Sequence, residues 1–372
     1  SINSDNMVTF SNSDRTENFR KLNSLMDLIN KNFLFDIDEE NVKTSMFKGL
    51  FQGLDDPYSI YLDKDERAAL MESTSGEYAG VGLQVSVTKD NFIQVISPIK
   101  GSPADKKGIK TGDLIIKIDG DIYSGDQLND AVSVMKGDAG KDVTLSIRRP
   151  VSDGSYEEID FVITREIITL NTVEYTTIED IGYISISNFG DNTDSEFESA
   201  FENLKEKKVK GIVIDLRGNP GGLLNSTVAI ADYILPEGII VKTVDKNGKE
   251  EVKKSDANSQ DMPLVVLVNK GSASASELLT GALQDYKKAV VVGTVTFGKG
   301  IVQSSIPLDS IGDDGAVNIT VAEYFTPNNR KIHEVGVTPD NVIEMDEEIE
   351  LGPNNVTNDI QLKKGLDILR GK

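Results

Sequence analysis

Hydrophobic positions along the chain change their spacing twice, and each change marks a different kind of structure. Between residues 17 and 52, apolar side chains recur at helical spacing and predict two or three short helices. These side chains are Phe19, Leu22, Leu25, Met26, Leu28, Ile29, Val42, Met46, Phe47 and Leu50. A turn cluster at 53–58 ends them, and Asp-Lys-Asp-Glu at 63–66 is typical of another helix start. Residues 1–75 are predicted to form a helical N-terminal region.

Short apolar runs separated by glycine turns follow, from residue 76 to about 165. They predict strands, among them 84–87, with one amphipathic helix over 126–136. A glycine turn that enters a strand presents backbone N–H groups to a peptide carboxylate, while the strand edge pairs with the peptide main chain. Gly80, Val81, Gly82 and Leu83 are therefore the candidate peptide-binding residues, although the two glycines equally suit a plain tight turn.

From residue 166 to 345, buried strands alternate with helices, which is typical of a mainly parallel α/β core. Strands are predicted at 181–186, 211–216 and 264–268, and one helix over about 223–234. Residues 193–196, Thr-Asp-Ser-Glu, match a capping box that would begin another helix. The tail, 346–372, contains an amphipathic helix at 361–369 that we expect to dock on the core or on a second subunit.

Composition narrows the function classes. The 372 residues suit two or three domains, and the formal charge of −22 is spread along the chain, so unaided binding to nucleic acid is not expected. The absence of cysteine excludes disulfides, thiol catalysis and cysteine-ligated metal. No stretch approaches the roughly 18 apolar residues of a membrane span.

A serine-rich turn between a predicted strand and a predicted helix carries the candidate chemistry. Residues 271–277 read Gly-Ser-Ala-Ser-Ala-Ser-Glu, and the chain has one histidine, His333. A lysine held neutral is therefore the better candidate base for a serine nucleophile. Ser274 also forms a helix capping box with Glu277, so spacing alone does not separate nucleophile from cap, or Ser274 from its neighbours Ser272 and Ser276.

Lys299 follows Ser274 by 25 residues (299 − 274) and is the candidate base. Its pKa would have to fall from about 10.4 to about 7, which requires an apolar, buried setting. Gln303 would orient its amine without adding charge. The helix start supplies Ala275 N–H as one oxyanion donor, and a second is expected from the Gly-Asn-Pro-Gly-Gly turn at 218–222, from Gly221 or Gly222.

These motifs resemble the carboxyl-terminal processing, or tail-specific, proteases. The matching segments are Asn-Lys-Gly-Ser-Ala-Ser-Ala-Ser-Glu at 269–277, Gly-Ala-Leu-Gln-Asp at 281–285 and Thr-Phe-Gly-Lys-Gly at 296–300. The resemblance implies that Ser274 is the nucleophile, Lys299 the base and Gln303 its partner, with an oxyanion hole of Ala275 and one of the two glycines. The glycine turns of 76–165 are similar to those of a PDZ domain.

The resemblance covers nearly the whole chain and implies a multi-domain α+β fold. Its parts are the helical region 1–75, the PDZ domain 76–165, an α/β core of the crotonase or ClpP type over 166–345 and the helical tail 346–372. The implied activity is endoproteolysis near a protein's C-terminus, with the PDZ domain binding the substrate tail and gating the enzyme. No metal or other cofactor is expected.

The resemblance further implies a homodimer, an activating or substrate-delivering partner protein, and a place outside the cytoplasm after removal of an N-terminal signal or anchor. Two alternatives remain open at this point. One is a PDZ peptide-binding adaptor with an inert α/β domain, and the other is a hydrolase that uses His333.

Overall fold

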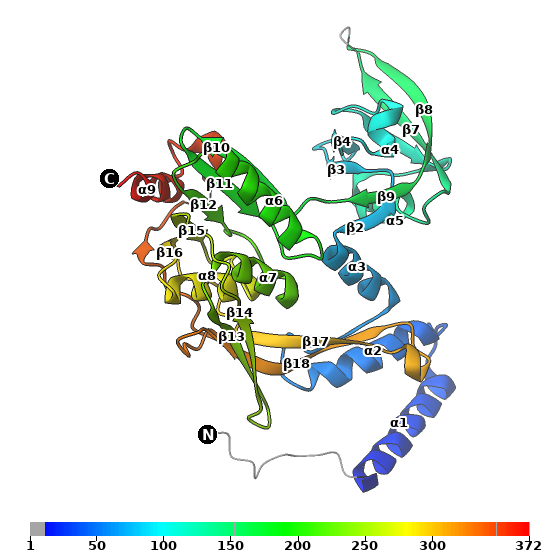
Figure 1. Cartoon of the computed structure of the whole chain (residues 1–372). Helices are drawn as coiled ribbons and strands as arrows, with labels where there is room; N and C mark the ends of the chain where they lie inside the picture. The colour runs from blue at the N-terminus through cyan, green and yellow to red at the C-terminus, as the bar shows by residue number, and fades with distance from the viewer. Residues whose placement is uncertain (1–11, 152–153, 347, 372) are drawn as a thin grey trace.

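We describe a computed structural model that covers residues 12–151, 154–346 and 348–371 (Figure 1). The N-terminal region contains α1 (Asn12–Asn32), α2 (Glu39–Gln52), β1 (Ile60–Leu62) and α3 (Lys64–Ser75). Asp63 caps α3, because its side chain accepts from the N–H groups of Asp65 and Glu66. The Glu66 side chain in turn accepts from Asp63 N–H. The predicted helix start is confirmed. Residues 1–11 of the predicted region lie outside the described residues.

The next module is antiparallel, with sheet order β3-β4-β5-β7-β8 and β6 beside β5. Its elements are β2 (Glu77–Gly80), β3 (Leu83–Val87), β4 (Ile93–Pro98), α4 (Pro103–Lys107), β5 (Leu114–Ile118), β6 (Asp121–Ile122), α5 (Leu128–Met135), β7 (Asp142–Pro150), β8 (Tyr156–Thr164) and β9 (Glu166–Thr169). A 3₁₀ turn at Gly125–Gln127 precedes α5, so the predicted helix at 126–136 is confirmed. Strand β3 lies at the sheet edge, where a peptide strand is able to pair.

The core is a six-stranded sheet of order β10-β11-β12-β15-β16-β19, parallel except for β10. Its elements are β10 (Val173–Ile178), β11 (Ile181–Ile186), α6 (Thr193–Glu206), β12 (Ile212–Asp215), α7 (Leu224–Ile234), β15 (Leu264–Val268), α8 (Ala275–Asp285), β16 (Ala289–Gly293) and β19 (Asn341–Val342). The predicted strands and the helix over about 223–234 are therefore confirmed, with 211–216 shortened to β12.

A second sheet lies beside the core and includes the N-terminal strand. Its order is β1-β18-β13-β14, and β17 pairs with β18. The strands are β13 (Gly238–Asp245), β14 (Glu250–Ser255), β17 (Ile301–Pro307) and β18 (Ala316–Phe325). Because β1 pairs with β18, the N-terminal region is joined to the sheet that carries residues 301–307.

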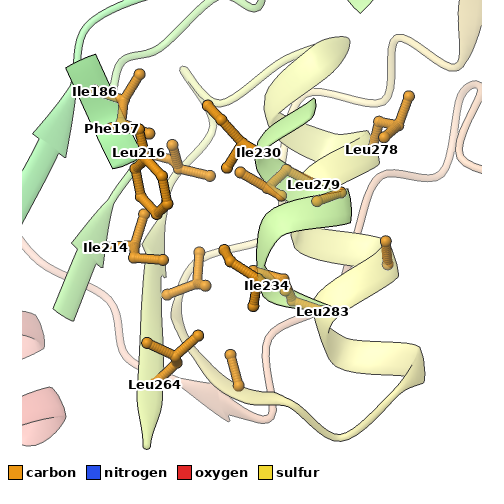
Figure 2. Close-up of a cluster of buried hydrophobic side chains, with 14 of the residues drawn as sticks. Ile186, Phe197, Ile214, Leu216, Ile230, Ile234, Leu264, Leu278, Leu279 and Leu283 are labelled. Atoms are coloured by element: carbon orange, nitrogen blue, oxygen red, sulfur yellow. The ribbon is translucent and has the colours of Figure 1, made fainter. Parts of the chain in front are cut away.

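Alternation along the central strands explains how the six-stranded sheet is covered on both faces. In β12, Ile212 and Ile214 pack into one cluster with α6, α7 and α8, whereas Val213 packs against α9 (Ile360–Leu369). Figure 2 shows the first cluster, including Ile214, Leu264 and Leu279. Leu362 and Leu366 of α9 are buried on the second face, so the tail docks on the core.

The predicted capping box at 193–196 is wrong. Asn192 is the N-cap of α6 and makes no side-chain cap bond. Thr193 Oγ1 instead accepts from Gly190 N–H, and the Glu196 carboxylate accepts from the N–H groups of Thr172 and Val173. The Thr193 hydroxyl also shares a hydrogen bond with Thr172 Oγ1 at 2.6 Å, so other contacts engage both side chains that the local pattern assigned to the helix end. Within the described residues, no helix has the length and apolar character needed to span a bilayer.

Candidate active site

Three loops meet at one edge of the parallel sheet. They leave the carboxyl ends of the neighbouring strands β12, β15 and β16, the edge at which open α/β sheets bind ligands. The first carries the glycine turn, the second the serine turn and the third Lys299. Ser274, Lys299, Gln303, Gly221 and Gly222 accordingly line one pocket of about 600 Å³. His333 is not among the residues that line it.

Ser274 differs from its two neighbouring serines in its surroundings. Ser272 and Ser276 are fully buried, and their hydroxyls donate to the carbonyls of Leu216 and Asn219, at 2.8 and 3.0 Å. Those two serines hold the glycine loop against the serine turn. Ser274 faces the pocket, and its backbone, with φ 53° and ψ −113°, lies outside the regions that residues with side chains favour.

Lys299 is half-buried and directs its amine at a neutral partner. Nζ donates to Gln303 Oε1 at 2.9 Å, and Gln303 Nε2 donates to the Tyr58 carbonyl at 3.2 Å. Burial lowers the pKa of Lys299, and the Asp56 carboxylate offsets part of that effect. Among the hydrogen bonds of the described residues, none joins Lys299 Nζ to Ser274 Oγ.

Glu277 has a tertiary role that its capping pattern did not reveal. Its buried carboxylate accepts from the N–H of Ser274 at 2.9 Å and from the N–H of Lys299 at 2.8 Å. It also accepts from Gly298 N–H and from Thr296 Oγ1, both at 2.6 Å. One carboxylate therefore joins the serine turn to the lysine loop. The Ser-x-x-Glu spacing identified the residue but not its second set of donors.

Tyr324 of β18 makes a second connection between the same two residues. Its buried hydroxyl lies 2.6 Å from the Ser274 carbonyl oxygen and 2.7 Å from that of Lys299, and donates to this pair. Burial raises the pKa of Tyr324 well above its usual range, so the hydroxyl keeps its proton. No local sequence signal pointed to this residue.

The glycine loop lies directly against the serine turn. A Cβ on Gly221 would stand 2.9 Å from Ser274 Cβ and 3.0 Å from Ala275 N, so only glycine fits there. Gly221 N–H is engaged, because it donates to Asn219 Oδ1 at 2.8 Å. Within the described residues, the N–H groups of Ala275 and Gly222 have no hydrogen-bond acceptor.

A buried ion cluster fixes the start of this loop. The Arg217 guanidinium donates to Asp215 and to Asp359, which precedes α9, at distances of 2.6 and 2.7 Å. Burial alone would raise the pKa of Asp359, but the hydrogen bonds and charge of Arg217 hold it below its usual range. The C-terminal tail thereby holds the strand end from which the glycine turn begins.

The predicted peptide-binding residues lie in the antiparallel module. Val81, Gly82 and Leu83 line a small pocket of about 120 Å³, opposite Val132 and Met135 of α5. Gly80 is not part of this lining and forms a β-bridge with Lys136. Gly82 has φ 79°, and a Cβ there would lie 2.3 Å from Ser102 Cβ, so the turn requires glycine.

Three family models match separate stretches of the chain. The model of peptidase family S41 matches residues 180–343, that of the PDZ domain matches 94–149, and that of the activating protease CtpB N-terminal domain matches 2–66.

Individual relatives extend the likeness over most of the length. The carboxy-terminal-processing protease of Bartonella bacilliformis is 38% identical, and the match covers 91% of this chain and 78% of that protein. The carboxy-terminal processing protease CtpB of Bacillus subtilis is 34% identical, with 96% and 73% covered. The solved structure of the photosystem II D1 C-terminal processing protease is 31% identical, with a TM-score of 0.52 and coverage of 90% and 89%. The chain therefore belongs to the carboxyl-terminal processing proteases, the serine proteases of peptidase family S41 that here carry a PDZ domain.

Proposed function

We propose that this protein is an endopeptidase that uses Ser274 as nucleophile and Lys299 as general base to cleave proteins near their C-termini. The observation that carries the proposal is the setting of Lys299. Its amine is half-buried, bonded to an uncharged amide, and lines the same pocket as Ser274. A lysine in such a setting gives up its proton more readily than an exposed one.

In the proposed reaction, Ser274 Oγ attacks the scissile carbonyl carbon while neutral Lys299 Nζ accepts the hydroxyl proton. The lysine then gives that proton to the leaving amine as the C–N bond breaks and the acyl-enzyme forms. Water then gives a proton to the same amine and attacks the ester carbonyl. The ester C–O bond breaks as the lysine returns that proton to Ser274 Oγ, which restores the free enzyme. Gln303 Oε1 would hold the amine in place through each transfer.

The developing oxyanion would lie between the N–H groups of Ala275 and Gly222. Both donors have no acceptor within the described residues, whereas Gly221 N–H already donates to Asn219. Gly222 is therefore the better assignment of the two glycines, and Gly221 is needed for the close approach of the loop to Ser274.

The PDZ domain would bind the substrate tail along the β3 edge, with its carboxylate at residues 81–83. A reporter polypeptide ending in apolar residues, with a free or an amidated C-terminus, tests this. We expect amidation to lower kcat/KM about tenfold, because it removes a charge-assisted hydrogen bond. Mass spectrometry would locate the cut, and Ser274→Ala should cleave neither reporter. Equal cleavage of both reporters would contradict tail recognition, and tail binding without cleavage would favour an adaptor.

The two pockets are connected through α3, which supports gating by the PDZ domain. Lys136 lines the PDZ pocket and forms an ion pair with Glu72 of α3. The neighbouring α3 residues Leu70, Met71 and Thr74 line the pocket of Ser274. A bound peptide carboxylate would compete with Glu72 for Lys136 and so loosen α3 from the PDZ domain.

Glu72→Gln is expected to raise cleavage of a reporter without a recognised tail about threefold, because the ion pair that holds α3 is lost. Steady-state rates with amidated and free reporters would measure this change. Glu166→Gln is the matched control, since Glu166 forms an ion pair with Lys106 and neither residue belongs to α3. A rise in both variants, or in neither, would count against this coupling.

We further propose that the protein forms a homodimer. The exposed apolar side chains of α1 and the loop after it suit a second copy of the chain, which sedimentation would test. They are Phe19, Leu25, Leu28, Ile29, Phe33, Leu34 and Phe35.

The family resemblance also supports two other proposals. One is a partner protein that activates the enzyme or delivers its substrate, which co-purification would test. The other is a place outside the cytoplasm, which cell fractionation would test.

A further inference from the structure

A short segment of the N-terminal region reaches the lysine side of the active site. Residues 56–59 precede β1, are joined to Thr320 of β18 by two hydrogen bonds and are tied together by a third. Asp56 Oδ2 accepts from Ser59 Oγ at 2.6 Å and from Thr320 Oγ1 at 2.7 Å, and Ser59 Oγ accepts from Thr320 N–H at 3.0 Å. Thr320 lies opposite Gln303 in the sheet. The same part of β18 therefore holds both the segment and the Gln303 side of the proposed base site.

Tyr58 makes two separate contacts with the Lys299 and Gln303 pair. Its carbonyl accepts from Gln303 Nε2 at 3.2 Å, which turns Gln303 Oε1 toward the lysine amine. Its ring centroid lies 4.4 Å from Lys299 Nζ. The backbone contact sets the direction of the amide, and the ring covers one side of the amine.

We propose that Tyr58 is a positioning residue of the base site, which the N-terminal region thereby completes. Its carbonyl orients Gln303, and its ring keeps water from the Lys299 amine. The inference rests on the proposed role of Lys299 as general base. It adds that the parallel core alone is not sufficient to orient Gln303 and to shield the Lys299 amine from water.

The ring acts on Lys299 in two opposite ways. Its face attracts an ammonium ion, which favours the protonated form, while its bulk excludes water, which favours the neutral amine. The charged or titratable groups nearby are Asp56 in the segment, Glu277 on α8, which accepts from Lys299 N–H, Tyr324 on β18, which donates to the Lys299 carbonyl, and His333, which interacts electrostatically with Asp56. Burial has the largest effect on the pKa of Lys299 and lowers it. Since the ring lies against the amine and contributes to that burial, its loss is expected to expose the amine to water and make the lysine harder to deprotonate.

The rate of labelling by a fluorophosphonate probe, followed from pH 6 to pH 10, tests the inference without a tail-bearing substrate. Tyr58→Ala is expected to slow labelling about tenfold at pH 7, with the midpoint of the profile moved to higher pH and the rate recovered there. Tyr58→Phe keeps ring and carbonyl and should follow the wild-type profile. Tyr58→Leu keeps an apolar cover and should shift the midpoint less, and it replaces Tyr58→Ala if that variant does not fold.

Two outcomes would overturn the inference alone. The first is a Tyr58→Ala labelling rate that is lowered by the same factor at every pH, which a purely structural role would give. The second is a midpoint of the Tyr58→Phe profile that shifts as far as that of Tyr58→Ala. Labelling of Lys299→Ala in parallel distinguishes failure of the Tyr58 inference from failure of the proposed function. Wild-type labelling of that variant would overturn both, whereas slow labelling of Lys299→Ala with an unshifted Tyr58→Ala midpoint would overturn only the role of Tyr58.

Discussion

Replacement of Lys299 by alanine is expected to lower kcat/KM for a tail-bearing reporter by about 10³-fold or more at pH 7, because Lys299 is the only lysine or histidine among the described residues that line the pocket of Ser274. Lys299→Arg should be equally inactive. A guanidinium keeps the positive charge but does not lose its proton in proteins, so it cannot accept one from the serine. Steady-state cleavage followed by mass spectrometry would measure both variants.

The pH dependence of the wild-type enzyme gives the same mechanism a second test. Lys299 works only when neutral, so kcat/KM should rise with pH through the pKa of its amine and then level off. Because burial lowers that pKa, the rise should begin below the ordinary range of lysine.

His333→Ala is the matched control for the alternative base. We expect it to retain wild-type cleavage, since His333 does not line the pocket. Loss of activity in His333→Ala together with normal cleavage by Lys299→Ala would reverse the assignment and favour histidine chemistry.

Glu277→Gln is expected to lower kcat about 10²-fold with little change in KM. The carboxylate accepts from the backbone N–H groups of both Ser274 and Lys299. The second carboxylate oxygen accepts from Thr296 Oγ1 and Gly298 N–H, and the NH₂ group of an amide would face these two donors, so the lysine loop would be displaced from Ser274. Misplacement of reacting groups by about 1 Å is sufficient for a rate loss of this size. The proposed tail-binding site lies on the PDZ domain, away from Glu277, so tail binding should persist.

Stability must be separated from this effect, because each buried donor left unpaired costs about 1–3 kcal/mol. Glu196→Gln is the matched control, since Glu196 also accepts from two backbone N–H groups, those of Thr172 and Val173, away from the pocket. Both variants should melt earlier, but only Glu277→Gln should lose kcat. A parallel loss of kcat in both, or a normal kcat in Glu277→Gln, would contradict a positioning role.

The period of the apolar positions was sufficient to predict most of the architecture. Continuous runs such as 212–214 and 264–268 are apolar at every position, which is typical of strands in a sheet that is covered on both faces. Glycine turns and one amphipathic helix placed the antiparallel module in the same way. These features are local, so a sequence pattern records them. The capping pattern at 193–196 failed because both side chains form hydrogen bonds with Thr172, which is distant in the sequence.

At the candidate site, the sequence by itself determined which residue types were present and, through family resemblance, which serine and which lysine to choose. Only the tertiary structure distinguished Ser274 from Ser272 and Ser276 by contacts, and Gly222 N–H from the engaged Gly221 N–H. It alone brought Tyr58 to Lys299, two residues 241 positions apart (299 − 58). Hydrogen bonds and burial between segments so distant depend on how the sheets pair, and no local spacing encodes them.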